Sequence, residues 1–363
     1  TGVQTCALPI SKGTATVNIL QPNQVVNVTV VLVGTGSIAA YHLGGLVHVP
    51  EAVVRWIVGR DKARTAATAD RYGAAASTDL ADVLQRDEVD AVIVATPDDT
   101  HESIAIDVAR AGKALMLQKP MAADSAACRR ILAAFVDAGT DLQVSFMHRY
   151  FDECAAARVL VAGGAVGAVR SIRVRNATPG PDWADWFFDP ARVSGGVVHQ
   201  LGVHGIDLLG LMAGPILEVS ARTAILRPTR VLADGREVPV RNPDSAWATY
   251  GLVSGAVASH EMSMIEAAGC DRYRMEIYGD EGTLFLRATP GPLALRRRGA
   301  AAWDLPAVEL SPVGARHHQR WIDGLLGRAP PETTSAEALA GIVVAEAVLE
   351  SARLGGAMQK VPG

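Results

Sequence analysis

The stretch Val28-Thr-Val-Val-Leu-Val-Gly34-Thr-Gly36-Ser-Ile-Ala39 decides the fold of this chain. Its first six residues are mostly β-branched and lack polar alternation, which is typical of a strand buried on both faces of a parallel sheet. Two glycines and a helix-like stretch follow. Gly34 permits a tight turn out of the strand, Gly36 lets the backbone approach a phosphate, and Ala39 lets the helix pack closely on the strand.

This strand, turn and helix together predict a dinucleotide site. A helix N-terminus offers free N–H groups and the positive end of its dipole to phosphates, and Ser37 and Ile38 form the first turn here. A lone Gly-x-Gly-x-x-Ala has low specificity, but this one follows a strand and opens a helix inside a βαβ unit, the context that the motif requires. We therefore expect Gly34, Gly36, Ser37 and Ile38 to bind the cofactor.

Further apolar runs alternate with helix-like stretches through the first half of the chain. Strands are expected at 52–58, 90–95, 114–117 and 142–146. Strands that alternate with helices at this spacing form right-handed βαβ units and a doubly wound parallel sheet. The pattern predicts an α/β fold that begins with an NAD(P)-binding Rossmann domain over residues 25–147.

The pattern changes after about Arg149. Residues 171–175 and 272–278 alternate with period two, so one face of each strand is exposed to water. More strands are expected at 246–253, 256–264 and 283–286, and a long apolar helix at 335–354. We therefore predict an α+β domain with a large, mostly antiparallel open sheet over 148–330. In 331–363 we expect a C-terminal helix that packs back on the body.

The composition excludes several classes of protein. The chain has 363 residues, of which 49% are hydrophobic and 20% charged, and a net charge of -4 without a long run of one sign. That argues against a protein that binds nucleic acid or a membrane surface. No stretch reaches the roughly 18 apolar residues of a membrane span. The cysteines Cys6, Cys128, Cys154 and Cys270 show no CxxC pair, so we expect no metal site or disulfide framework, and reduced thiols in a cytoplasmic protein.

The N-terminal segment 1–24 is excluded from the fold prediction. Its first ten residues, TGVQTCALPI, have the sequence of a translated sequencing-adapter oligonucleotide. The segment also lacks the order of basic start, apolar run and small-residue cleavage site that defines a signal peptide. We treat it as adapter-derived or disordered.

The end of the second strand bears on the choice between NAD and NADP. An acidic residue about 20 residues beyond the glycines binds the ribose 2′-hydroxyl of NAD. Gly59 stands where that acid is expected, and Arg60 follows. A glycine and an arginine leave room and positive charge for a 2′-phosphate, which favours NADP. Asp61 is either the cap of the next helix or the ribose acid displaced by two positions.

Two segments carry candidate catalytic groups. Lys119 follows the expected strand at 114–117, and ligands bind at the carboxyl ends of such strands. Later, Gln200, His204 and Asp207 stand at i, i+4 and i+7, which on an α-helix places them on one face. A lone histidine is more often a satisfied core residue. A polar stripe in an apolar segment with a glycine-rich approach instead predicts a pocket.

At these positions the chain resembles the Gfo/Idh/MocA oxidoreductase family. The likeness runs along nearly the whole length after Val25. It is carried by Gly34-Thr-Gly-Ser-Ile-Ala39, Ala95-Thr-Pro-Asp-Asp-Thr-His101, Ala111-Gly-Lys113, Gln118-Lys-Pro120, Phe146-Met-His-Arg149, Gly195 to Asp207 and Val348-Leu-Glu-Ser-Ala-Arg353.

The chain departs from the family pattern at two carboxylates. The family has Glu-Lys-Pro where this chain has Gln118-Lys119-Pro120, and usually an aspartate where this chain has Gln200. An amide donates and accepts hydrogen bonds but takes no proton. Lys119 also lacks a neighbouring negative charge that would favour its charged form. These departures bear on the proton relay more than on cofactor binding.

The resemblance implies hydride transfer between nicotinamide and a secondary alcohol, or the matching ketone, of a sugar, inositol or related polyol. Lys119 would stabilise charge on the reacting oxygen, and His204 would take or give the proton. Gln200 would orient His204 or a substrate hydroxyl. Thr96, Pro97, Gln118 and Lys119 would join the cofactor site, and His101 either caps its own helix or approaches the cofactor.

The expected substrate residues come from three places. Trp183 and Asp185, with Trp186 and Arg192, lie in an aromatic loop that either walls a sugar pocket or only packs. Arg149 belongs to the resembling segment before the second domain. Asp207 either touches substrate or anchors its helix.

Two other functions stay open. One is a glycosidase of the same fold that oxidises its sugar transiently on bound NAD, and the other is a cofactor-binding regulator without turnover. The resemblance also implies a homodimer or homotetramer that pairs through the open face of the second domain's sheet.

Overall fold

The first half of the chain forms a six-stranded parallel sheet in the order β3-β2-β1-β4-β5-β6. The structure is a computed structural model that describes residues 27–269, 272–287, 293–330 and 335–362, so the segment 1–24, Cys6 and Cys270 lie outside it. This strand order is that of dinucleotide-binding doubly wound folds, and the predicted Rossmann fold is confirmed. The strands are β1 (Val28–Val33), β2 (Ala52–Val58), β3 (Ala75–Ser77), β4 (Ala91–Val94), β5 (Ala114–Gln118) and β6 (Leu142–Ser145).

Helices cover both faces of this sheet, which explains why its strands are apolar on both sides. The helices are α1 (Ser37–Leu46), α2 (Lys62–Tyr72), α3 (Leu80–Leu84), α4 (His101–Arg110) and α5 (Ser125–Ala138). Val30 and Leu32 of β1 pack in one core with α1. Val31 and Val33, on the opposite face, pack in a second core with α4 and α5. The alternating directions of strand side chains produce this division.

The turn after β1 requires a glycine at its first position. Gly34 has φ +112°, a value that residues with a side chain rarely adopt. A Cβ on Gly34 would also lie 2.5 Å from the carbonyl oxygen of Ala95, at the end of β4. The two neighbouring strand ends can approach this closely only because Gly34 has no side chain.

The second half of the chain forms an eight-stranded sheet in the order β15-β14-β13-β7-β12-β11-β8-β16. Only β7 and β12 pair in parallel among its described strands, so the predicted mostly antiparallel sheet is confirmed. Its strands are β7 (Val169–Ala177), β8 (Ile216–Ala224), β11 (Ser245–Leu252), β12 (Val257–Ser263), β13 (Tyr273–Gly279), β14 (Gly282–Arg287), β15 (Leu293–Arg297) and β16 (Gln359–Lys360). A separate hairpin pairs β9 (Thr229–Val231) with β10 (Glu237–Pro239).

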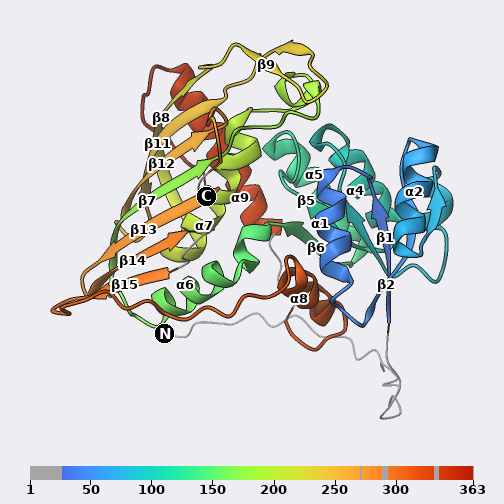
Figure 1. The fold of residues 1–363 in the computed structure, drawn as a ribbon, viewed down its shortest axis with the longest axis horizontal. Coiled ribbons are helices and arrows are strands. Elements are labelled where there is room, and N and C mark those ends of the chain that lie inside the picture. The colour runs from blue at the N-terminus through green and yellow to red at the C-terminus, as the bar shows by residue number, and fades with distance from the viewer. Residues whose placement is uncertain (1–26, 270–271, 288–292, 331–334, 363) are drawn as a thin grey trace, which may run out of the picture.

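Helices cover one face of the large sheet and leave the other open (Figure 1). The covering helices are α6 (Asp152–Ala162), α7 (Val203–Ala213) and α9 (Ser335–Arg353). The apolar helix α9 packs on β8, α7 and α5, so it contacts both halves of the molecule. Before it, α8 (Ala315–Leu325) packs on α1, and its Trp321 and Ile322 join the core of the first sheet. The chain thus returns from the second sheet to the first within the segment 148–330.

A buried ion pair fixes the second half against the first. Arg149 lies in the short helix η2 (Met147–Tyr150) directly after β6, and its Nε and Nη2 atoms donate to the two carboxylate oxygens of Asp207 in α7, at 2.7 and 2.5 Å. The side chain of Asp207 is 1% exposed. This two-pronged geometry is the strong form of an arginine–carboxylate contact. It holds α7 at the end of the parallel sheet, and both side chains are engaged.

Removal of this carboxylate should destabilise the protein strongly. We expect Asp207→Ala to lower the free energy of unfolding by about 3–5 kcal/mol, because it leaves a guanidinium buried without its partner. The apolar pair Arg149→Met/Asp207→Leu should recover much of that loss. Chemical denaturation measures both effects.

The matched control is Asp280→Ala, which removes an exposed ion pair with Arg170 and should change the stability far less, because solvent screens exposed pairs. A loss in Asp207→Ala no larger than in this control would contradict the anchoring role.

Candidate active site

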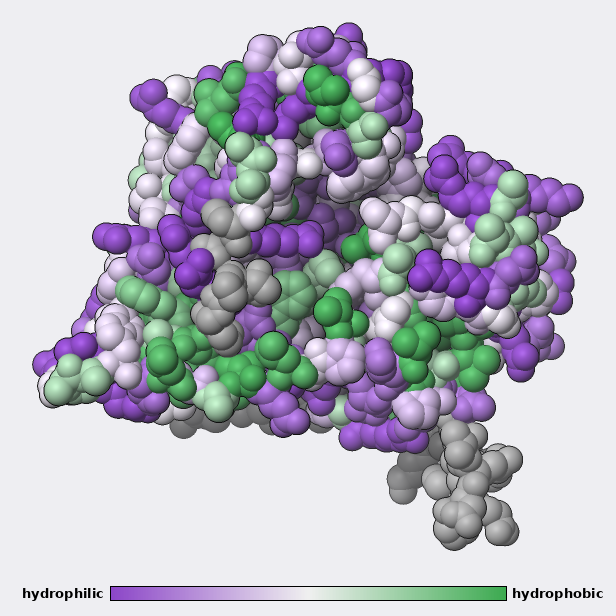
Figure 2. Space-filling view, in the orientation of Figure 1, coloured by the Kyte–Doolittle hydropathy of each residue, from purple (hydrophilic) through white to green (hydrophobic). Residues whose placement is uncertain are grey.

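The candidate site lies at the carboxyl ends of β1, β4 and β5, where the second domain approaches the first. The surface is hollowed between the two halves of the molecule, and hydrophilic residues line the hollow (Figure 2). Lys119 marks the junction, because its Nζ donates to the backbone oxygen of Gln200 at 2.9 Å. The bond joins the end of β5 to the segment that leads into α7.

The turn after β1 fits the pyrophosphate of a dinucleotide. Gly36 is the N-cap of α1, makes no side-chain cap and is exposed. A Cβ built on Gly36 would meet nothing within 4 Å, so open space lies directly over the helix N-terminus. Ser37 and Ile38 form the first turn there, as expected. Free N–H groups beside open space are what an anionic phosphate needs.

The end of β2 separates the roles of its three residues. Asp61 caps α2 by accepting a hydrogen bond from the backbone N–H of Arg64 at 3.0 Å, so the first of its two expected roles is the one that the structure shows. A Cβ on Gly59 would lie 2.5 Å from Oγ1 of Thr65, and packing against α2 therefore requires glycine here. Arg60 is exposed and makes no ion pair with the described residues.

The segment after β4 is held by His101, which is buried. One ring nitrogen of His101 lies 3.0 Å from the backbone oxygen of Thr96 and the other 2.9 Å from that of Pro120. Its side chain does not cap α4. The ring thus braces the end of β4 against the turn after β5 and leaves neither nitrogen for the cofactor, contrary to our expectation. Thr96 and Pro97 are part-buried beside the glycine turn.

Gln118 faces the protein interior, and this corrects its expected place in the cofactor site. Its amide oxygen accepts from the backbone N–H of Lys119 at 2.9 Å, and its Nε2 donates to Nε2 of His42 at 3.0 Å. Nδ1 of His42 lies 2.9 Å from Nε2 of His318. Nδ1 of His318 lies 2.7 Å from the backbone oxygen of Gly314. The chain of bonds runs from β5 through α1 to α8.

The amide explains how these histidines stay neutral. Since Nε2 of Gln118 only donates, Nε2 of His42 must accept, and the ring protons of His42 and His318 then point along the chain towards Gly314. Burial, with the neighbouring His318, lowers the pKa of His42 well below its usual value, and burial lowers the pKa of His318 to about 4. A glutamate at 118 would offer His42 no proton. The amide therefore completes a neutral structural network.

Gln200 lies in a π-helical turn, η4 (Val198–Gly202), immediately before α7. The expected common face of Gln200, His204 and Asp207 assumed α-helical spacing throughout, and a π turn breaks that spacing. The structure gives each residue a different partner. Nε2 of Gln200 lies 3.5 Å from Oδ2 of Asp98, and Asp207 binds Arg149.

His204 stacks on His148 at a centroid distance of 3.9 Å. Both rings are fully buried, and none of their four nitrogens has a hydrogen-bond partner among the described residues. Burial is the main cause that lowers the pKa of each ring well below its usual value, and nearby positive groups such as Lys119 lower it further. Buried polar atoms without partners are rare in folded proteins. Two neutral imidazoles in this state are suited to bind a substrate hydroxyl.

Lys119 combines burial with mixed electrostatics. Burial and the charge of Arg272 lower the pKa of Lys119 to about 8, and the carboxylate of Asp98 opposes that fall. Near neutral pH its amine can therefore exist in either protonation state, as acid–base work requires.

Three residues of this site escaped the sequence prediction. His148 lies in the resembling segment 146–149, from which only Arg149 was chosen. The sequence pattern predicts Arg272 only as part of a strand, although its positive charge lowers the pKa of Lys119, His148 and His204. Asp98 lies in the short helix η1 (Asp98–Thr100), within the resembling segment after β4, and no role was expected for it.

The aromatic loop packs mainly on itself and on the β9–β10 hairpin. Asp185 pairs with Arg236 at 3.2 Å, and Trp183, which is more than half exposed, meets the edge of Phe187. This arrangement favours the packing role for both residues. Arg192 instead reaches the first domain and pairs with Asp99 at 2.6 Å.

Within the ranges that the structure describes, no helix is long and apolar enough to cross a membrane. The same ranges contain no group of three or more His, Cys, Asp or Glu residues that could hold a metal ion.

Comparison with known proteins identifies both halves of the chain. Residues 28–146 match the oxidoreductase family with an NAD-binding Rossmann fold, and residues 154–285 match the GFO/IDH/MocA C-terminal domain. An inositol 2-dehydrogenase of Rubrobacter xylanophilus is 31% identical, over 92% of this chain and 93% of its own length. A D-apiose dehydrogenase of Paraburkholderia graminis is 26% identical, over 89% of this chain and 87% of its own.

A solved structure supports the same assignment. The crystal structure of GenD2 from gentamicin A biosynthesis in complex with NAD has a TM-score of 0.79 and 28% identity, and it covers 95% of this chain and 99% of its own. The glycine turn that fits a pyrophosphate, the lysine beyond β5 and the open second sheet agree with these matches. The chain therefore belongs to the Gfo/Idh/MocA family of NAD-binding oxidoreductases.

Proposed function

We propose that this protein is a dehydrogenase or reductase that transfers hydride between a nicotinamide cofactor and a secondary alcohol, or the matching ketone, of a sugar, inositol or related polyol. The observation that carries the proposal is the buried pair of unpartnered imidazoles, His148 and His204, within electrostatic reach of Lys119. The names of the relatives, an inositol dehydrogenase and an apiose dehydrogenase, support the polyol class.

The nicotinamide, when bound, accepts or donates the hydride. Lys119 hydrogen-bonds the reacting oxygen and stabilises its negative charge. In the direction of oxidation, its neutral amine takes the hydroxyl proton while the carbonyl forms. We revise the role of His204, because a ring with so low a pKa is a weak base. His204 and His148 orient substrate hydroxyls instead.

Removal of Lys119 or His204 should abolish most turnover. Oxidation is followed by the absorbance of reduced nicotinamide against a panel of sugars and polyols. We expect Lys119→Ala to lower kcat by about 10²-fold or more, and wild-type oxidation to rise as the pH passes through about 8, where the amine loses its proton. Lys113→Ala is the control, since Lys113 binds the backbone of Arg86 instead.

Full activity in Lys119→Ala and His204→Ala would refute the site. Product formed without net change in reduced cofactor would identify the glycosidase alternative. Cofactor binding with no turnover on any substrate would identify the regulator.

We also propose that the cofactor is NADP in preference to NAD. Arg60 supports this choice, because it is exposed at the end of β2 and free of ion pairs with the described residues. Asp61, the nearest acid, has its carboxylate engaged as the cap of α2.

The cofactor preference predicts a selective loss on removal of Arg60. Arg60→Ala should weaken the binding of NADP about tenfold, the effect of one lost charge-assisted hydrogen bond, and leave NAD nearly unchanged. Arg55→Ala, which removes an exposed arginine of β2, controls for net charge. Fluorescence titration of the wild type and both variants measures the affinity of each for NAD and NADP, and equal losses for both cofactors in Arg60→Ala would argue against NADP.

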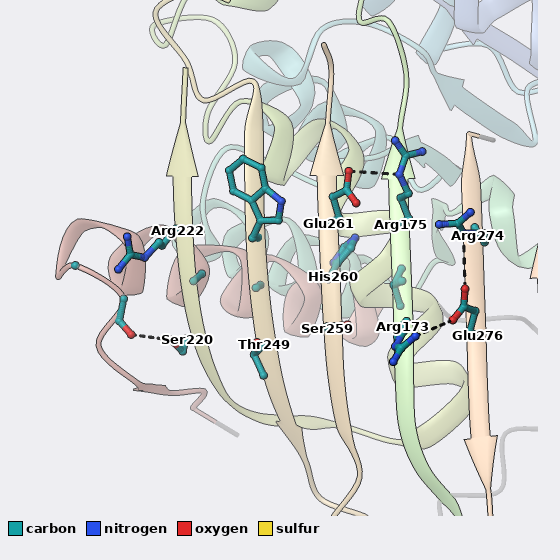
Figure 3. Close-up of a pocket in the computed structure, with 16 residues that line it drawn as sticks. Arg173, Arg175, Ser220, Arg222, Thr249, Ser259, His260, Glu261, Arg274 and Glu276 are labelled. Carbon is teal, nitrogen blue, oxygen red and sulfur yellow. Dashed lines mark hydrogen bonds and ion pairs between the residues drawn. The ribbon is translucent and has the colours of Figure 1, made fainter. Parts of the chain in front are cut away.

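The open face of the large sheet supports a proposal of self-association. A hollow of about 670 Å³ lies on it, and charged side chains line that hollow in opposite pairs (Figure 3). Arg175 pairs with Glu261 at 3.3 Å, and Arg173 with Glu276 at 3.6 Å. Trp247 stands among them, 45% exposed. We propose that two copies pair through this face to form a dimer, or a tetramer of such dimers. An isologous interface needs this kind of self-complementary surface.

A charge in this face should separate the copies. We expect Trp247→Glu to halve the mass of the assembly, from dimer to monomer or from tetramer to dimer, in light scattering after size-exclusion chromatography, with an unchanged circular dichroism spectrum. Val136→Glu, at an exposed position of α5, should leave the assembly intact. An unchanged mass for Trp247→Glu would exclude this face as the interface.

Free buried thiols fit a reducing compartment. Cys128 and Cys154 are both buried and unpaired. Such thiols are usual in the cytoplasm, and we propose that the protein acts there.

A further inference from the structure

We propose that Asp98 exchanges a proton with Lys119 during turnover and so supplies the acid–base function that the amides at 118 and 200 cannot. The inference rests on the proposed function and concerns a residue for which the sequence suggested no role.

Asp98 and Lys119 both contact the same residue of the second domain, Gln200. Asp98 begins η1, just beyond β4, and is 6% exposed. Its Oδ2 lies 3.5 Å from Nε2 of Gln200, whose backbone oxygen accepts from Nζ of Lys119 at 2.9 Å. The carboxylate and the amine thus approach Gln200 from neighbouring strand ends.

The neighbouring carboxylates are otherwise engaged. Asp99 pairs with Arg192 at 2.6 Å and Asp207 with Arg149 at 2.5 Å. Asp98 has no ion pair within 4.0 Å among the described residues, and its contact with the Gln200 amide is long. A hydrogen bond from its own backbone N–H favours the carboxylate, but a buried carboxylate without an ion pair is still costly. Such groups are concentrated at functional sites.

The amide at 200 is consistent with this role. A carboxylate at 200 would bring a second negative charge within hydrogen-bond distance of Asp98, and two such groups cannot easily both ionise. The amide instead donates to Asp98. The loss of a carboxylate at 200 and the presence of one at 98 are therefore complementary.

The charges around Asp98 favour transfer. Burial raises the pKa of Asp98 to about 6, with Asp99 acting in the same direction, while a hydrogen bond from its own backbone N–H and the charges of Lys119 and Arg192 oppose the rise. Burial and Arg272 lower the pKa of Lys119 to about 8. The two pKa values thus approach each other, which reduces the barrier to moving a proton between the groups.

The proton path balances in the direction of oxidation. The substrate carbon gives its hydride to the oxidised cofactor, and the neutral Lys119 amine takes the hydroxyl proton as the carbonyl forms. No contact within 4.0 Å joins the two groups, so a bridging water carries that proton from the ammonium to the Asp98 carboxylate. Asp98 then releases it to water, and Lys119 is ready for the next cycle.

The first test follows Lys119 in cofactor-free protein. The lysines of the chain are Lys12, Lys62, Lys113, Lys119 and Lys360, few enough for each labelled side chain to be assigned by NMR. We expect Asp98→Asn to lower the pKa of Lys119, because the carboxylate that stabilises the ammonium is gone. Asp99→Asn, which changes the exposed neighbour, should leave it unchanged.

The second test is kinetic. Asp98→Asn should lower kcat about 10²-fold at neutral pH, with its affinity for cofactor retained, and Asp99→Asn should lower it far less. In the Asp98→Asn background, Gln200→Glu, which keeps the side-chain length of glutamine, returns a carboxylate to the same contact. This double variant should recover at least tenfold in kcat and restore the wild-type pH profile.

An unchanged Lys119 titration in Asp98→Asn would overturn the proposal, and so would full activity of that variant. A double variant no faster than Asp98→Asn would overturn it as well. Should the wild type oxidise no polyol, the proposed function fails, yet the NMR titration still decides whether Asp98 and Lys119 are coupled.

Discussion

One hydrogen bond, from the ammonium of Lys119 to the backbone oxygen of Gln200, joins the two domains at the candidate site. The donor stands at the carboxyl edge of the parallel sheet, and the acceptor lies in the π-helical turn before α7. Such turns are rare in proteins as a whole, but those that occur are often found at functional sites, where they interrupt the regular α-helical bonding. The bond forms only if α7 is held at the edge of the first sheet. The buried pair of Arg149 and Asp207 holds it there.

The two amides of this chain have different physical consequences. Gln118 closes a neutral network through His42 and His318, where a carboxylate would leave the histidine nitrogen without a donor. Gln200 contacts both Asp98 and Lys119, and a carboxylate at this position would place a second negative charge beside that of Asp98. Their shared effect is to leave Asp98, among the described residues, as the acidic group that contacts Gln200 as Lys119 does. The departures from the family pattern therefore lie in the proposed proton path, and the glycine turn of the cofactor site matches the pattern.

Local patterns predicted the first domain well, because its strands and glycine turn are set by neighbours in sequence. The β-branched run at 28–33, Gly34 and the capping Asp61 each act within a few residues. Lys119 was found because its place follows from the end of a strand. The pairing of His42 with His318 spans 276 positions, and no local pattern contains it. The prediction that Gln200 and His204 share one helix face was wrong, because it assumed α-helical spacing and the sequence pattern does not reveal a π turn. The role of Arg272 was missed for a related reason. The strand pattern of 272–278 predicts which side chains are exposed, but it does not predict that the strand begins near Lys119, whose pKa the charge of Arg272 lowers.

Cofactor and substrate are proposed to meet at Lys119, in the hollow between the two halves of the molecule. A crystal structure of the wild-type protein with reduced cofactor and a polyol that it oxidises tests this most directly. We expect the pyrophosphate over Gly34 and Gly36, and the reacting hydroxyl within about 3 Å of Nζ of Lys119, with His148 and His204 bound to the same substrate. A polyol seated elsewhere, for example in the hollow on the open face of the large sheet, would contradict it.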